Sequence, residues 1–308
     1  MTQELDKRLR MALAGTDVDA LIDVGCDLAE ADRQTDALVC FQRAVALGEE
    51  LMWFNVGNTL RQLERPLEAI DAYEKAVAAG ETDAWLNLGI VLELEGDLAA
   101  AMNAYRAAWD LGGQPEGLMN LALLLREQGL REEAEATLTQ AAEHGNAAAA
   151  ALLATWRWER TRDPALEAQL RAGAPVDGDT RASLAALLLA TGRRAEARAQ
   201  LELGAKLGQD ECWLPLGNLL CGDDLDRDDL DGEELDREVA ADEVIDEVAA
   251  EEAYRAGIAS GDLFCHHNLA MLLLDRGDTD GADVHLLAGA TGGDEMAQRA
   301  WKRLHTDD

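Results

Sequence analysis

One short run in the sequence combines side chains that bind metals or act as nucleophiles: Cys265, His266 and His267 are consecutive. Adjacent residues on a helix point in different directions, so these three side chains are not expected to converge on one ion. His144 and His285 stand elsewhere, and the sequence holds no Walker phosphate-binding loop, no G-x-S-x-G and no H-E-x-x-H motif. We therefore predict no catalytic residue, no cofactor and no metal centre, and a packing or surface role for the histidines.

A second candidate for ion binding is an acidic insertion at about residues 222–247. From residue 222 to residue 252 the chain has sixteen acidic residues against two arginines, a local charge of about −14. Asp229, Asp231, Gly232 and Glu238 have the spacing of a calcium-binding EF-hand loop, but Arg227 stands at the first ligand position and repels calcium. The segment therefore favours weak, non-specific cation binding. Its later part, from residue 237, is predicted to extend the helix that follows.

An internal repeat supplies the elements that position these residues. A small residue recurs at steps of 32, 32, 33, 32, 31, 32 and 53 residues, and we call it the anchor of each repeat. The anchors are Gly25, Gly57, Gly89, Ala122, Ala154, Ala185, Gly217 and Ala270. Most anchors are followed by leucine after three residues, alanine after twelve and an aromatic residue or leucine after sixteen. Agreement in so many registers predicts eight copies of one unit, with the acidic insertion inside the seventh.

Each repeat divides into two amphipathic helices. Trp53, Val56 and Leu60 illustrate the first helix, with apolar residues four and one before the anchor and three after it. This is helical spacing on one face. Glycines seven residues after four of the anchors, such as Gly96, are expected to end the first helix in the left-handed conformation. The fifth repeat departs from the pattern at Thr161, Leu166 and Asp177.

The residues AWLNLG at positions 84–89, followed by Ala101 and Tyr105, resemble the tetratricopeptide repeat, whose pattern is W-x₂-L-G-x₂-Y and then A-x₃-F. Glycine replaces the family's terminal proline, and the A-x₃-G ending is similar to the Sel1-like sub-type of the same superfamily. The resemblance covers about residues 17–294 and implies an all-α fold, a right-handed α-solenoid of about eight helix-turn-helix repeats. Residues 1–16 and 295–308 are expected to be capping helices, because solenoids cover their apolar ends.

The resemblance also implies a binding surface. Tetratricopeptide arrays bind partners mostly in the concave groove of their first helices, at positions three before, two before, one after and four after each anchor. Two before the anchor, four repeats have an asparagine: Asn55, Asn87, Asn120 and Asn268. In some members such a ladder grips a peptide backbone, since an amide offers both a donor and an acceptor. Asparagine is also simply common at this position in the family, and both interpretations stay open.

The other groove positions are mostly apolar. Three before the anchor are Phe54, Leu86 and Met119; one after are Asn58, Ile90 and Leu123; four after are Arg61, Glu93 and Arg126. This composition predicts a partner segment with apolar side chains and an acidic residue that pairs with one of the two arginines.

The charge of the chain limits the classes of partner. With 27 basic and 61 acidic residues the net charge is −34, which disfavours nucleic acid and anionic membranes as partners. No signal-peptide pattern or membrane-spanning apolar run is visible, and five scattered cysteines fit reduced thiols, so we expect a cytoplasmic protein. The preferred function is a non-catalytic scaffold or adaptor that binds a protein or peptide in the groove. The alternative is a structural or assembly protein that docks a basic partner through the acidic insertion. The pattern leaves the oligomeric state open.

Overall fold

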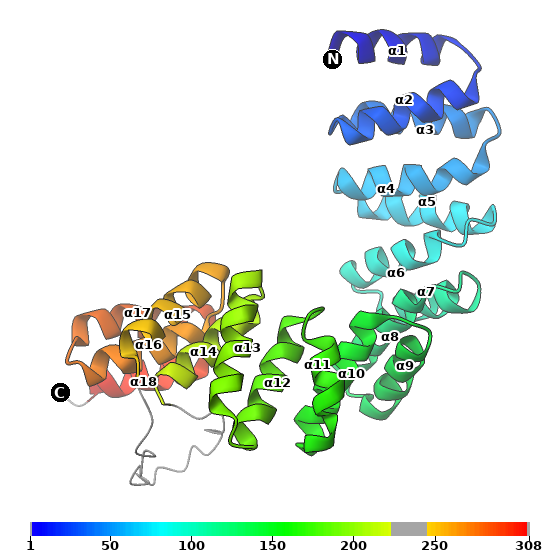
Figure 1. The fold of residues 1–308 in the computed structure, drawn as a ribbon. Helices are drawn as coiled ribbons and strands as arrows, with labels where there is room; N and C mark the ends of the chain where they lie inside the picture. Colours follow the sequence, from blue (N-terminus) through cyan, green and yellow to red (C-terminus); the bar gives the residue numbers. More distant parts are fainter. Residues whose placement is uncertain (1, 223–244, 307–308) are drawn as a thin grey trace. The chain divides into compact units, whose positions relative to one another are not determined.

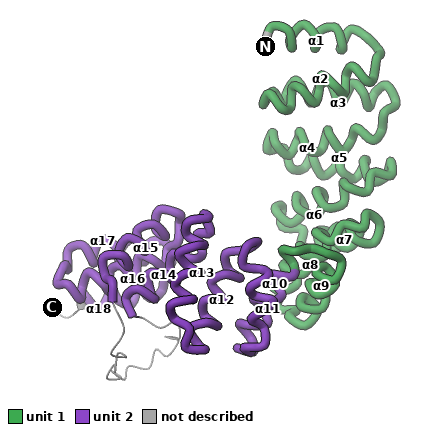
Figure 2. The backbone as a smooth tube through the Cα atoms, in the orientation of Figure 1, with its two compact units in different colours: residues 1–149 green, residues 150–308 purple. Residues whose placement is uncertain are grey.

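The computed structural model describes residues 2–222 and 245–306, and this part of the chain is helical without any β-strand. It forms two compact units, residues 1–149 and residues 150–308 (Figure 2).

Residues 1–149 form antiparallel helix pairs in sequence order (Figure 1). The helices are α1 (Thr2–Ala14), α2 (Val18–Glu30), α3 (Gln34–Ala46), α4 (Trp53–Gln62), α5 (Pro66–Ala78), α6 (Ala84–Leu94), α7 (Leu98–Asp110), α8 (Pro115–Glu127) and α9 (Arg131–Glu143), with a 3₁₀ turn at Glu50–Met52. Each of α3, α5 and α7 packs against the helix before it and the helix after it. The first helices α2, α4 and α6 therefore follow one another along one side of the unit, and the second helices along the other (Figure 1).

The second unit continues the same alternation. Its helices are α10 (Ala147–Thr161), α11 (Glu167–Gly173), α12 (Gly178–Ala190), α13 (Arg194–Leu207), α14 (Trp213–Leu220), α15 (Glu247–Ser260), α16 (Phe264–Asp275), α17 (Thr279–Gly292) and α18 (Glu295–Thr306), with 3₁₀ turns at Pro164–Leu166 and Asp210–Cys212. The pairs from α2/α3 to α16/α17 are the eight predicted repeats, which confirms the all-α solenoid of helix-turn-helix units. Helices α1 and α18 stand where capping helices are predicted, and their capping role stays a prediction.

The turn after each first helix needs a left-handed residue. Gly96 and Gly129 have φ of +82° and +79°, as the sequence pattern predicts. The first two repeats place Asp32 and Glu64 at the same position, with φ of +58° and +56°. A non-glycine residue in this region carries a steric cost from its Cβ atom. The turn geometry is therefore kept even where its favoured residue is absent.

The anchor residue and the residue sixteen positions later fill one space in the core. A Cβ atom added to Gly57 would lie 2.6 Å from the ring of Tyr73, and one added to Gly89 would lie 2.5 Å from the ring of Tyr105. Glycine anchors accordingly pair with an aromatic ring and alanine anchors with leucine. The pairs are Gly25/Phe41, Gly57/Tyr73, Gly89/Tyr105 and Gly217/Tyr254, and then Ala122/Leu138, Ala154/Leu170, Ala185/Leu201 and Ala270/Leu286. In the seventh repeat the insertion lies between the two members, so Gly217 and Tyr254 are 37 residues apart.

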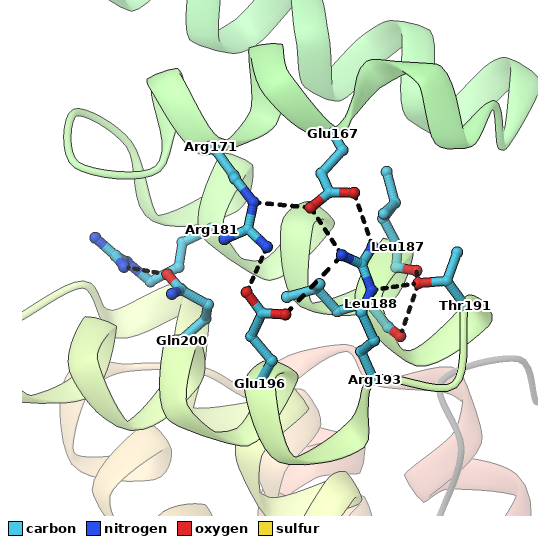
Figure 3. Close-up of polar contacts among 9 residues, drawn as sticks. All are labelled: Glu167, Arg171, Arg181, Leu187, Leu188, Thr191, Arg193, Glu196 and Gln200. Atoms are coloured by element: carbon cyan, nitrogen blue, oxygen red, sulfur yellow. Dashed lines mark hydrogen bonds and ion pairs between the residues drawn. The ribbon is translucent and has the colours of Figure 1, made fainter.

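The fifth repeat has a second helix of only seven residues, α11, and an ion-pair network ties this helix to α13 (Figure 3). Glu167 accepts hydrogen bonds from Arg171 Nε at 2.8 Å and from both terminal nitrogens of Arg193 at 2.8 and 2.9 Å. Arg171 also pairs with Glu196. The hydrogen bonds from Arg193 and Arg171 lower the pKa of Glu167 to about 2. The network thus adds polar contacts where this repeat has lost helix length.

Most of the acidic insertion, residues 223–244, lies outside the described residues, and so does the calcium-type spacing predicted within it. The following helix, α15, begins at Glu247, and the side chain of Asp246 caps it by accepting a hydrogen bond from the backbone N–H of Ala249 at 3.1 Å. The prediction that this helix extends from residue 237 is therefore wrong for Ile245 and Asp246, which precede it.

Candidate functional site

The candidate site is the exposed side of α4, α6 and α8, the first helices of the second, third and fourth repeats. All groove residues predicted within residues 1–149 lie on these helices, and none of them is buried. They are Phe54, Asn55, Asn58 and Arg61 on α4, Leu86, Asn87, Ile90 and Glu93 on α6, and Met119, Asn120, Leu123 and Arg126 on α8. Together with Leu94 of α6 we call them the first-helix surface. The remaining predicted residue, Asn268, lies on α16 in the other unit.

Helix α6 carries an aliphatic stripe in which Leu86, Ile90 and Leu94 follow one another at intervals of four residues. Residues four apart on a helix lie on the same face, one turn above the other. The side chain of Leu94 is 76% exposed. Leu94 is not among the residues predicted from the sequence, although its spacing of four residues from Ile90 is a visible signal. Covering such a side chain with a partner is favourable by about 25 cal/mol per Å² of apolar area removed from water.

Helix α8 repeats this arrangement in shorter form. Met119 and Leu123 are again four residues apart, and Leu123 is 38% exposed. On α4, the ring of Phe54 is partly exposed and stands against Tyr73, with ring centroids 6.3 Å apart. The first-helix surface therefore carries apolar side chains in each of the three repeats, and on α4 Phe54 is the one such residue.

The asparagines of the predicted ladder have hydrogen-bond partners within the protein. Asn87 donates from Nδ2 to Asn58 Oδ1 at 2.9 Å, across the boundary between two repeats. Asn55 donates to the sulfur of Met52 at 3.1 Å. The amide of Asn120 instead acts on the hydroxyl of Tyr105, whose pKa it lowers. The three amides thus face three different partners, and their use as a peptide-binding ladder stays a prediction.

The hydroxyl groups of buried tyrosines complete these contacts. Tyr73 donates to Asn58 Oδ1 at 2.8 Å, so one amide oxygen accepts from both the second helix of its own repeat and the first helix of the next. Burial raises the pKa of Tyr73, and a hydrogen bond with Arg61 opposes that rise. In the next repeat Tyr105 donates instead to Glu93, and burial together with this carboxylate raises its pKa.

The same relay occurs in residues 150–308. Asn218 Oδ1 accepts hydrogen bonds from Tyr254 Oη at 2.9 Å and from Asn268 Nδ2 at 2.7 Å. This role was not predicted from the sequence, because the three residues lie on three different helices and the insertion lies between Asn218 and the other two. Asparagine one residue after a glycine anchor, with tyrosine at the paired core position, is the signal that both copies share.

Acidic side chains stand at the start of each stripe. Glu50, Asp83 and Glu116 are all exposed: Glu50 begins the 3₁₀ turn that precedes α4, Asp83 immediately precedes α6, and Glu116 lies in the first turn of α8. Carboxylates at these ends are favourable for the helices themselves, since a helix N-terminus carries partial positive charge. Asp83 is three residues before Leu86, and Glu116 is three before Met119, so each carboxylate also shares a face with the apolar side chains.

The Cys265-His266-His267 run forms part of the second unit and faces several directions. Cys265 is fully buried, and burial raises its pKa. The Nδ1 atoms of His266 and His285 lie 3.0 Å apart, and burial lowers the pKa of both rings. Within residues 2–222 and 245–306, no three His, Cys, Asp or Glu side chains are arranged to hold a metal ion. The histidine pair, which joins α16 to α17, was not foreseen from the sequence.

In the same described part of the chain, every helix is too short or too polar to cross a bilayer.

Comparison with protein families gives consistent matches. A profile described as tetratricopeptide repeat matches residues 24–84 and 54–114, and a second profile with the same description matches residues 115–140, 178–202 and 263–288. Together the matched ranges cover more than half of the chain. They leave out residues 141–177 and 203–262, which hold the fifth repeat and the insertion. No curated protein sequence matches the chain.

Solved structures of repeat proteins share the fold. A Sel1 repeat protein from Oxalobacter formigenes has a TM-score of 0.64 at 17% identity, covering 98% of this chain and 90% of that one. A protective antigen of uropathogenic Escherichia coli with an SLR (Sel1-like repeat) fold has a TM-score of 0.61 at 21% identity, covering 98% and 67%. A tetratricopeptide repeat protein from Parabacteroides merdae has a TM-score of 0.54 at 15% identity, covering 84% and 100%.

Proposed function

Because the chain belongs to the tetratricopeptide repeat superfamily, we propose that it is a non-catalytic scaffold or adaptor that binds a partner protein or peptide on the first-helix surface. The observation that carries this proposal is the row of half-buried and exposed aliphatic side chains on the consecutive first helices α6 and α8, with Leu94 76% exposed. Contiguous apolar surface of this kind is typical of protein interaction sites. Proteins of this superfamily are typically interaction scaffolds.

A matched pair of substitutions tests the surface. Leu94→Asp places a charge on the first-helix surface, whereas Leu67→Asp places one on α5, a second helix, at a leucine that is 71% exposed. Both side chains are exposed, so neither substitution disturbs the core. Affinity capture from cell extract should recover a partner with the wild-type chain and with Leu67→Asp, and lose it with Leu94→Asp. Equal recovery by both variants would overturn the proposal.

The ladder interpretation has its own test. Once a partner is identified, Asn87→Ala and Asn120→Ala should weaken its binding if these amides grip a peptide backbone. Unchanged affinity would show that asparagine at this position serves the protein's own hydrogen bonds.

The alternative function is a structural or assembly role in which the acidic insertion docks a basic partner. The observation that favours it is the concentration of sixteen acidic residues in residues 222–252. Deletion of residues 223–244 keeps Asp246, which caps α15, and so leaves the flanking helices intact. Loss of the partner on this deletion, with retention in Leu94→Asp, would favour the insertion over the first-helix surface.

A further inference from the structure

We infer that the first-helix surface takes a cationic amphipathic α-helix as its partner segment; this inference rests on the proposed function and gives the chemistry of its ligand.

The hydrogen-bonding needs of the ligand backbone favour a helix over an extended segment. An extended segment that covers this surface must find partners for its own N–H and C=O groups. Asparagines that bind one extended backbone must have the same hydrogen-bonding environment in successive repeats. Here Asn55 donates to a sulfur and Asn87 to an amide oxygen of the preceding repeat, so amides at the same repeat position are held differently. A helical segment bonds its own backbone internally and needs no such row.

The spacing and polarity of the side chains on α6 and α8 also favour a helical ligand. Leu86, Ile90 and Leu94 on α6 and Met119 and Leu123 on α8 offer aliphatic side chains at helical intervals. An amphipathic helix binds such a surface through apolar residues at positions i, i+3 or i+4, and i+7. The contact then consists largely of apolar packing, beside asparagines such as Asn55 and Asn87 whose amides already bond within the protein.

The carboxylates at one edge of the surface favour a cationic ligand. Arg61 and Arg126 lie toward the C-terminal ends of α4 and α8, whereas Glu50, Asp83 and Glu116 are exposed at the starts of the three helices. Asp83 accepts a hydrogen bond from Gln114 at 3.0 Å and Glu116 one from Asn146 at 3.5 Å, and these neutral donors do not cancel the carboxylate charges. Residues 1–149 as a whole have 27 acidic and 11 basic side chains. A ligand helix with lysine or arginine beside its apolar face meets complementary charge at this edge, which favours association and orients the helix. An acidic ligand helix is repelled.

A displayed library of random 20-residue peptides, selected on the full-length protein, tests the inference. Enriched peptides should be net basic, lack internal proline and show apolar residues at i, i+3 or i+4, and i+7. As synthetic peptides they should gain helicity on binding, as measured by circular dichroism. We expect Leu94→Asp to weaken their binding at least tenfold and Leu67→Asp to change it less than twofold.

A separate variant tests whether the negative charge of the surface contributes to binding. The triple change Glu50→Gln, Asp83→Asn and Glu116→Gln keeps side-chain shape and one acceptor oxygen at each position and removes three negative charges. It should weaken basic peptides at least threefold and flatten the dependence of their affinity on salt.

The outcomes separate the inference from the proposed function. Enriched peptides that are proline-rich or alternate apolar and polar residues, and that need Leu94, would overturn the helical ligand and leave the proposed function standing. Peptides that are acidic, or that the triple variant binds equally well, would overturn the cationic ligand. A selection that yields no peptide sensitive to Leu94→Asp would overturn both.

Discussion

Asn87 Nδ2 donates a hydrogen bond of 2.9 Å to Asn58 Oδ1 and so links the first helices of two consecutive repeats. The same oxygen accepts from the hydroxyl of Tyr73 at 2.8 Å. One carboxamide therefore connects three helices, two from one repeat and one from the next. In a solenoid, where each repeat contacts only its neighbours, the coupling between repeats depends on such contacts.

Asn58→Ala should lower the free energy of unfolding by about 1–3 kcal/mol, because it leaves the buried Tyr73 hydroxyl and the Asn87 amide without their acceptor. Urea unfolding followed by circular dichroism measures the change. Tyr73→Phe removes one donor and leaves the other bond in place, so it should cost less.

The control for this prediction is Asn103→Ala, at an exposed position on α7. Surface substitutions of this kind change stability by less than about 0.5 kcal/mol. Equal urea midpoints for Asn58→Ala and Asn103→Ala would show that the relay does not couple the repeats.

Gly89→Ala should destabilise the third repeat by about 1–3 kcal/mol, because the new Cβ atom would lie 2.5 Å from the ring of Tyr105. The chain itself suggests the rescue, since alanine anchors pair with leucine in four other repeats. Gly89→Ala combined with Tyr105→Leu should therefore be at least about 1 kcal/mol more stable than the sum of the two single changes predicts. Additive effects in a double-mutant cycle of thermal or urea unfolding would contradict this pairing.

The sequence predicts the repeats well because their signal is local. The period, the helical spacing around each anchor and the glycine turns depend on residues within one unit, and all eight helix pairs follow from them. The candidate surface follows in the same way, since its residues keep fixed positions relative to the anchors. Leu94 can also be predicted from local spacing, because it lies one helical turn beyond Ile90.

Contacts between helices are harder to predict from one sequence. Asn58 and Asn87 are 29 residues apart, and their bond depends on how two repeats stack. Glu93 takes the tyrosine hydroxyl in the third repeat, where the position after the anchor is Ile90 instead of asparagine. The network around Glu167 likewise joins α11 to α13, and no local pattern marks it.

Glu64→Gly should raise the free energy of unfolding by about 0.5–1 kcal/mol. Glu64 has φ of +56°, where an L-residue carries a steric cost and glycine does not. The greater freedom of glycine in the unfolded chain offsets part of the gain. Gln62→Gly, two residues earlier and within the last turn of α4, is the control and should lower stability by about 0.5–1 kcal/mol. A loss of stability in both variants, measured as the thermal midpoint, would contradict the argument from φ.

The stability of residues 150–308 should depend on pH, because it depends on the ionisation of Glu167. Hydrogen bonds from Arg193 and Arg171 lower its pKa in the folded protein to about 2, below the ordinary value of 4.5. A group with a depressed folded-state pKa stabilises the protein above the unfolded-state pKa and loses this contribution as pH falls through the folded-state value. Glu167→Gln should therefore be less stable than the wild-type chain at neutral pH, and the difference should shrink between pH 4.5 and pH 2.

Urea midpoints of both chains across this pH range, followed by circular dichroism, measure the effect. Glu74→Gln, at an exposed position on α5, provides the control for the removal of one negative charge from an acidic protein. A difference between wild type and Glu167→Gln that stays constant from pH 7 to pH 2 would mean that the carboxylate is not held ionised by its two arginines. The short helix α11 would then depend on its apolar contacts, such as those of the buried Leu170, and not on the network drawn in Figure 3.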